Sequence, residues 1–233
     1  MTLTQDHIQD LYKFTRAHYV EHYDLQTELV DHLANGIEQQ WEEHPSLGFE
    51  EAKQREFKKF GKAGFKKVIA ARKKAMIRKY RGILWGYFMK WWTFPKIITT
   101  FSGVLIVFCL LRTLPEGDSK FISVAAVLLG LSILMYQRIF QLKSNLEGLC
   151  KKWLLQEMIY EKGVTIQFLL FPIYFVIIGN KAGFLENTFG QLVFTALLIV
   201  VLILFIISAY VIPSKAEELL AETYPEYKFQ EKV

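Results

Sequence analysis

The sequence predicts an all-α protein in which an N-terminal cytoplasmic helical domain precedes a four-helix transmembrane bundle. Three observations predict this class. Apolar residues make up 52% of the 233-residue chain, and nearly all of the long apolar runs lie after Thr93. The first 92 residues are charged and amphipathic instead, with apolar positions at helical spacing. They show no strand-like alternation. The uneven distribution of apolar residues therefore divides the chain into a soluble helical half and a membrane half.

This division predicts four parts. They are a helical domain over residues 1–80, an aromatic interfacial linker over 81–94, a transmembrane region over 95–213 and a cytoplasmic tail over 214–233. The four predicted spans are residues 95–112, 120–138, 164–180 and 189–212, and a cytoplasmic loop over 138–163 joins the second span to the third. The loops after the first and third spans are too short to cover apolar helices from water, so lipid must surround these helices.

The predicted spans differ in length. At a rise of about 1.5 Å per residue, the fourth span reaches about 36 Å, which exceeds the bilayer's hydrocarbon core of about 30 Å. The apolar cores of the second and third spans reach only about 24 Å each. These two spans therefore need help from flanking residues, and Lys120 and Arg138 can extend their charged groups from the ends of the second span to the headgroups.

The distribution of Lys and Arg near the span ends predicts the orientation. One side of the membrane carries the basic segment before the first span, five basic residues of the 138–163 loop, and Lys215. The other side carries only Arg112, Lys120 and Lys181. The first side is therefore cytoplasmic, and four spans place both termini there. Because the N-terminal residues contain no apolar signal-peptide core, we expect the first domain to stay in the cytoplasm. The expected localisation is an inner membrane, which the chain crosses several times; the resemblance described below implies a bacterial one.

Charge is unevenly distributed before the first span. Residues 1–52 contain eleven acidic residues against two basic ones, whereas residues 53–81 contain thirteen basic residues against one acidic residue. Six aromatic residues follow between positions 85 and 94. Anionic headgroups attract a juxtamembrane basic segment, and amphipathic aromatic side chains favour the membrane boundary. The predicted membrane-surface residues are Lys66, Lys67, Arg72, Lys73, Lys74, Arg78, Lys79, Arg81, Trp85, Trp91 and Trp92.

The same basic segment has the composition of a nucleic-acid-binding surface. Its position directly before a span favours phospholipid instead. We therefore expect a lipid bilayer with anionic headgroups as the partner, and no nucleic acid.

Four helices account for the first 80 residues. The first covers about 5–19, with Thr4 as its cap, and the second begins after Asp24, a good N-cap residue. Apolar residues four positions apart keep the second helix in phase through Asn35 and Gly36. The third helix covers about 49–60 and ends at Gly61, and the fourth begins near Lys62.

The helical domain carries a pattern of residues found in a known type of domain. The pattern is E-L-x-x-H-L in one helix, E-E-A at the start of the next, and F-G at its end; here these are Glu28, Leu29, His32, Leu33, Glu50, Glu51, Ala52, Phe60 and Gly61. Residues 12–74 thereby resemble the HAAS-type α-helical domain. Domains of this type precede multi-span membrane segments in bacterial proteins that are often encoded beside PadR-type transcriptional regulators. The resemblance implies a regulatory or sensory membrane protein, and it establishes no enzymatic activity by analogy.

One short motif has the spacing of a zinc site. His18, Glu21 and His22 match H-x-x-E-H, in which two histidines on one helix bind zinc and the glutamate acts as a base. A catalytic zinc also needs a third ligand, and the match lies at a predicted helix end, just before Asp24. We therefore interpret the motif as an ordinary helix end, and the sequence predicts no catalytic, cofactor-binding or metal site. His32 is either a pH-sensitive group or, more simply, a residue that packs within the domain.

The leading hypothesis is a non-enzymatic membrane protein, regulatory or part of a complex, that couples the cytoplasmic domain to the four-span bundle. It predicts another membrane or cytoplasmic protein as a partner. A small transporter or channel is the alternative, although the spans lack the central ionisable residues that coupled transport normally uses. A zinc-dependent hydrolase is the third possibility.

Overall fold

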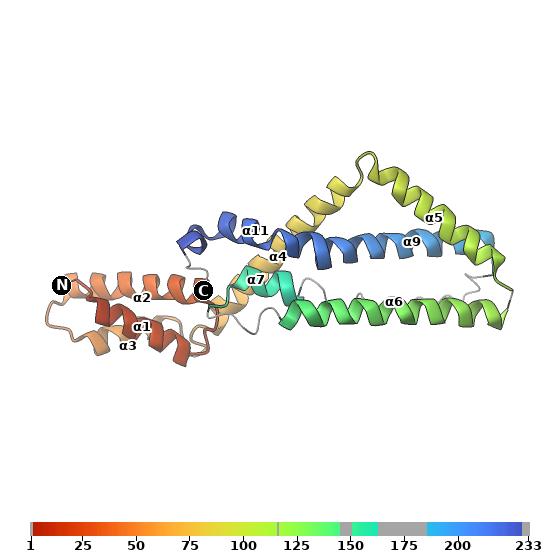
Figure 1. The fold of residues 1–233 in the computed structure, drawn as a ribbon. Helices are drawn as coiled ribbons and strands as arrows, with labels where there is room; N and C mark the ends of the chain where they lie inside the picture. Colours follow the sequence, from red (N-terminus) through yellow and green to blue (C-terminus); the bar gives the residue numbers. More distant parts are fainter. Residues whose placement is uncertain (1, 116, 145–150, 163–185, 230–233) are drawn as a thin grey trace. The chain divides into compact units, whose positions relative to one another are not determined.

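The structure is a computed structural model that describes residues 2–115, 117–144, 151–162 and 186–229 (Figure 1). All regular secondary structure in these residues is helical, which confirms the predicted all-α class for this part of the chain. The chain forms two compact units. The first combines Met1–Lys79 with Leu149–Glu157 and Tyr224–Val233, and the second combines Tyr80–Gly148 with Met158–Thr223.

Three helices form the core of the first unit: α1 (Gln5–Ala17), α2 (Tyr23–Glu43) and α3 (Phe49–Lys59). Figure 1 shows them side by side, and α2 contacts both of the others. The start of α1 follows the prediction, because the Thr4 hydroxyl accepts a hydrogen bond from the His7 amide at 3.3 Å. The apolar positions of α2 spaced four apart are all buried: Leu25, Leu29, Leu33, Ile37 and Trp41.

Gly36 lies in the middle of α2, which continues without a break through it. A Cβ atom at this position would overlap the carboxyl group of Glu56 on α3. Glu56 is only 2% exposed, and its Oε1 accepts a hydrogen bond from the Gln40 amide at 2.6 Å and pairs with Lys59. The glycine therefore allows a buried carboxylate to reach α2, and it does not mark a turn.

A glycine also ends α3. Phe60 caps the helix, and Gly61 follows with φ 73°, a left-handed conformation that only glycine adopts without strain. The chain then enters Phe65, which is 2% exposed and lies edge-on to Phe57 and Phe60 at ring distances of 5.0 and 4.9 Å. Helix α4 (Lys66–Trp91) begins at this aromatic cluster.

Three described helices are long and apolar enough to cross a membrane. They are α5 (Lys96–Thr113), α6 (Asp118–Ser144), and the continuous helical run formed by α9 (Thr188–Ile206), the π-helix η2 (Ile207–Val211) and α10 (Ile212–Ser214). They agree with the first, second and fourth predicted spans. The third predicted span, 164–180, lies outside the described residues.

Two core clusters give the relative directions of these helices. One cluster contains Leu111 near the end of α5, Val124 and Leu128 in the first half of α6, and Phe194 in the first half of α9. The other contains Met135 and Leu142 in the second half of α6, Phe205 near the end of α9 and Ala209 in η2. Therefore α6 and α9 run in the same direction, and α5 runs opposite to them (Figure 1).

Helix α6 is longer than the second predicted span, 120–138. Helix α6 has 27 residues and reaches about 40 Å at 1.5 Å per residue, because it continues beyond residue 138 to Ser144. The predicted loop 138–163 also contains α7 (Leu154–Glu157) and the π-helix η1 (Met158–Lys162). The predicted tail contains α11 (Ala216–Thr223) and η3 (Pro225–Phe229).

We predict that Gly36→Ala destabilises the protein by about 1 kcal/mol, because displacement of Glu56 disrupts its hydrogen bond with Gln40. Thermal unfolding of the full-length protein in detergent measures this change. In a Glu56→Ala background the overlap is absent, so Gly36→Ala should instead stabilise α2 by up to about 1 kcal/mol through helix propensity. Equal effects in both backgrounds would contradict the proposed contact.

Candidate functional site

The first turn of α2 receives a hydrogen-bond partner from a distant part of the chain. His22 is the N-cap residue, and its side chain makes no capping hydrogen bond. The first amide groups of a helix have no partner within the helix. Here the Tyr23 amide donates to the carbonyl of Lys152 at 2.8 Å. A residue 129 positions later therefore caps α2.

Asp24 connects three segments of the chain. Its Oδ1 accepts a hydrogen bond from the Leu154 amide at 3.2 Å, and its Oδ2 accepts one from the Tyr224 hydroxyl at 2.8 Å. The prediction that Asp24 is the N-cap of α2 is wrong, because α2 begins one residue earlier. Leu154 is the first residue of α7, so the Asp24 carboxylate caps α7.

The two helices α2 and α7 thus satisfy each other's free amide groups. The Lys152 carbonyl caps the start of α2, and the Asp24 carboxylate caps the start of α7. A carboxylate beside two helix N-termini is also favoured by the positive ends of both helix dipoles. This reciprocal arrangement fixes residues 152–154 against the start of α2.

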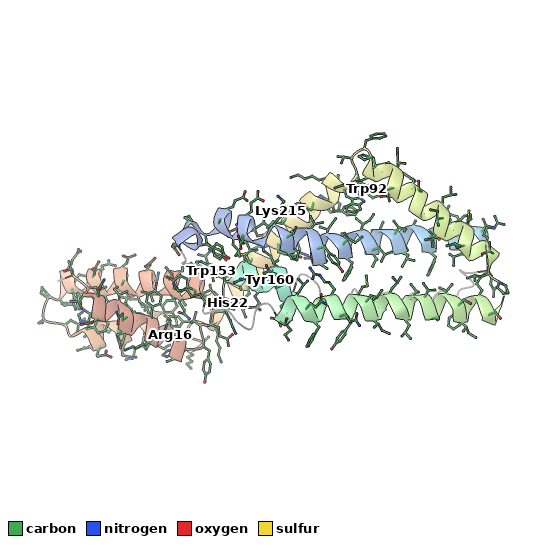
Figure 2. The ribbon with its side chains drawn as sticks, in the orientation of Figure 1. Arg16, His22, Trp92, Trp153, Tyr160 and Lys215 are labelled. Carbon is green, nitrogen blue, oxygen red and sulfur yellow. The ribbon has the colours of Figure 1, made fainter. Side chains whose placement is uncertain are left out.

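Aromatic packing closes the same region. Trp153 is 1% exposed, and its ring lies 5.2 Å from Tyr23, 4.7 Å from Tyr224 and 5.6 Å from Tyr227. Figure 2 shows Trp153 close to His22, which is 3% exposed and pairs with Glu157. We name this group the α2 junction and define it as His22, Tyr23, Asp24, Trp153, Leu154, Glu157 and Tyr224.

Tyr224 of the junction has a raised pKa. Burial of the phenol, followed by the negative charge of Asp24, raises the pKa of Tyr224 above its ordinary value of 10.0. The hydroxyl therefore keeps its proton and donates to Asp24 throughout the physiological pH range. The junction thus holds the tail by a hydrogen bond to a charged acceptor, a stronger kind than one between neutral groups.

The H-x-x-E-H residues do not lie on one helix. His18 is the C-cap of α1, Tyr19 has the left-handed φ of 63°, and His22 is the N-cap of α2. The His18 ring lies 4.5 Å from Phe57, whereas His22 pairs with Glu157. No group of three or more potential metal ligands occurs among the described residues. The helical geometry of the zinc motif is therefore not formed.

His32 lies on the exposed side of α2. Its ring lies 5.4 Å from that of Phe60, in an edge-on arrangement. The residue thus contacts the end of α3 from an exposed position.

All of the predicted membrane-surface residues except Trp92 lie on α4. Their side chains are exposed, apart from the half-buried side chains of Lys73, Trp91 and Trp92. Arg72 pairs with Glu28 on α2. The Trp91 indole donates to the Thr100 hydroxyl on α5 at 3.1 Å, which ties the aromatic end of α4 to the first span.

Sequence reasoning missed Trp153, Glu157 and Tyr224. The sequence contained one signal. The apolar residues Trp153 to Leu155 directly follow two lysines in a predicted cytoplasmic loop, where apolar residues are not expected. A tryptophan in such a position indicates a packing partner. Its partners lie more than 70 residues away on both sides, so local patterns could not identify them.

A comparison with protein-family models, curated proteins and solved structures finds no match to this chain. The structure itself defines the class: an all-helical protein with helices long and apolar enough to cross a membrane.

We predict that the tail is released from the junction at high pH. Because the pKa of Tyr224 is raised, its contribution to docking is fully present below about pH 10 and is lost as the pH rises above that value. A spin label at Glu226→Cys, with the native cysteines replaced by serine, should keep its mobility up to about pH 10 and become more mobile as the pH rises from 10 to 12. In the Tyr224→Phe variant the mobility should not change over this range. An equal change in both proteins would contradict the prediction.

Proposed function

We propose that this chain is a non-enzymatic, multi-pass membrane protein of the regulatory or sensory type, in which the α2 junction couples the N-terminal helical domain to the membrane bundle. One observation carries the proposal: the two oxygens of Asp24 accept hydrogen bonds from two different segments, one following α6 and one following α9. A single carboxylate of the domain thereby binds the chain at both places where it emerges from the bundle.

The connections from the junction to the bundle are helical. Helix α7, capped by Asp24, continues directly into η1, and Tyr224 directly follows α11. In the second unit, Tyr160 of η1 packs against the cluster of Met135, Leu142, Phe205 and Ala209. Helical segments transmit displacement better than flexible loops do, so a rearrangement at this cluster would reach the junction along both connections.

The directions of the helices support the four-span topology. Helices α6 and α9 run in the same direction, as the four-span topology requires of the second and fourth spans. The predicted third span lies between these two helices in the sequence. The α2 junction joins residues before α5, after α6 and after α9, which supports a common side of the membrane for these three segments. The Lys and Arg distribution makes this side cytoplasmic, in a bacterial inner membrane.

Helix α4 supports attachment to the membrane surface. The exposed basic residues of its first half provide charge for anionic headgroups, and Trp85, which is 61% exposed, provides an aromatic anchor in its second half. The resemblance of residues 12–74 to the HAAS-type domain supports a regulatory role. A second membrane or cytoplasmic protein is then the expected partner.

We predict that Asp24→Ala uncouples the junction. The Leu154 amide and the Tyr224 hydroxyl lose their acceptor, a loss of about 1–3 kcal/mol, so local opening should become about 5- to 150-fold more frequent. Hydrogen–deuterium exchange should therefore accelerate in residues 151–157 and 224–229 and remain unchanged in α3. The matched control is Asp31→Ala, an exposed acidic residue of α2. Unchanged exchange in α7 would contradict the coupling.

The same pair of variants tests the regulatory role. Cross-linking in native membranes should recover a second protein with the wild type and the Asp31→Ala variant, and less of it with Asp24→Ala. Recovery of the chain alone in all three cases would exclude a regulatory complex.

We predict from the topology that Lys152 and Glu226 lie on the cytoplasmic side and Ser119 on the opposite side. Single cysteines at these positions, in a background without Cys109 and Cys150, are to be labelled in intact cells with a membrane-impermeant thiol reagent. Only Ser119→Cys should react before the cells are broken. Labelling of Glu226→Cys in intact cells would contradict the four-span arrangement.

A further inference from the structure

Arg138, near the end of α6, is held in a fixed orientation against the end of the last span. Its Nε donates to the Ala209 carbonyl at 3.2 Å, and its guanidinium lies 4.5 Å from the centre of the Tyr210 ring. Both partners belong to the π-helix η2. Cation–π contact and a hydrogen bond together restrict a side chain that otherwise has many rotamers.

The sequence explains why the Ala209 carbonyl accepts an arginine. In an α-helix this carbonyl would accept from the amide four residues later, and that residue is Pro213, which has no N–H group. The helix widens to η2 in the same place. The Arg138 Nε supplies the donor, so the π-helix and the arginine form one local structure. Such π turns in helices are often found at functional sites.

The terminal amines of Arg138 keep most of their binding capacity. Nη1 makes only a long contact of 3.4 Å with the Gln141 side chain. In the described part of the chain, no carboxylate forms an ion pair with Arg138. Two neighbouring cations differ in this respect, because Lys143 approaches Glu161 at 4.0 Å and Lys215 approaches Glu218 at 3.0 Å. Arg138 is thus a half-buried cation that pairs with no carboxylate of the described residues.

The level of Arg138 along the span fits the headgroup boundary. It lies 18 positions after Lys120, which corresponds to about 27 Å along the helix. Three aromatic side chains at this level are largely exposed: Tyr136 at 58%, Phe140 at 65% and Tyr210 at 48%. Exposed aromatic residues are typical of the boundary between hydrocarbon and headgroups. Phosphate is the abundant anion at that depth.

We propose that Arg138 binds the phosphate of an anionic phospholipid of the cytoplasmic leaflet through its two terminal amines. The planar guanidinium matches two phosphate oxygens, and sites of this kind between membrane helices are known to take lipid headgroups. Tyr210 and the Ala209 carbonyl position the group before the lipid arrives. The inference rests on the membrane placement proposed above.

The competing interpretation is that Arg138 only joins α6 to η2. The two interpretations differ in what Arg138→Lys does. Lysine keeps the charge but presents a single point donor without the planar fork. A purely structural role predicts altered stability with no change in bound lipid, whereas the proposal predicts a loss of bound lipid at unchanged fold.

Native mass spectrometry of the full-length protein, titrated with phosphatidylglycerol in detergent, tests the site. We expect Arg138→Gln to weaken the tightest phosphatidylglycerol adduct about tenfold, and Arg138→Lys to weaken it less. Lys143→Gln, which removes a neighbouring charge paired with Glu161, should retain the wild-type affinity. If Arg138→Gln does not fold, the phosphatidylglycerol affinity of Arg138→Lys alone tests the proposal. Wild-type affinity in every folded Arg138 variant would overturn the proposal.

Two further measurements separate the sources of failure. A phosphate-free glycolipid should not replace phosphatidylglycerol, and inorganic phosphate at millimolar concentration should not displace it. Displacement by inorganic phosphate would overturn the lipid assignment and indicate a free-anion site. Recovery of the wild-type protein in the soluble fraction of cells, without detergent, would instead contradict the proposed membrane function.

Discussion

The reciprocal capping of α2 and α7 is the constraint on which the first unit depends. Each helix begins with amide groups that need acceptors, and each obtains one from the other: the Lys152 carbonyl for Tyr23, and the Asp24 carboxylate for Leu154. A helix start buried without such partners is costly. The arrangement therefore makes a segment that follows α6 a necessary part of the N-terminal domain.

This constraint also compensates for the small size of the domain. A helical unit of about 80 residues buries little apolar surface by itself and is only marginally stable. Trp153, Leu154 and Leu155 add three side chains that are at most 1% exposed, and Tyr224 adds a ring against Trp153. Because these residues come from segments that follow α6 and α9, distant parts of the chain complete the apolar core of the first unit.

Two contacts between polar groups join helices of the second unit. Arg138 provides the donor that Pro213 removes, and the Trp91 indole binds Thr100 where α4 meets α5. Elsewhere the helices present apolar side chains outward, including Phe101, Leu105 and Leu134, each more than 60% exposed. Large exposed apolar surfaces of this kind mark contact with lipid or protein.

The sequence by itself determined the all-α class, the helices of the first 60 residues, and three helices of membrane-spanning length, because helical periodicity, turn residues and apolar runs are local properties. It also located the basic and aromatic residues of α4. It misassigned Asp24 and placed residues 139–144 in a loop, although they continue α6, since a carboxylate's partner and a helix's continuation past the apolar run depend on distant contacts. Only the tertiary structure decided that Asp24, Trp153 and Tyr224 meet, and that Arg138 replaces the amide missing at Pro213. These pairings join residues separated by more than 70 positions, and no local pattern encodes which of many compatible partners a side chain will find.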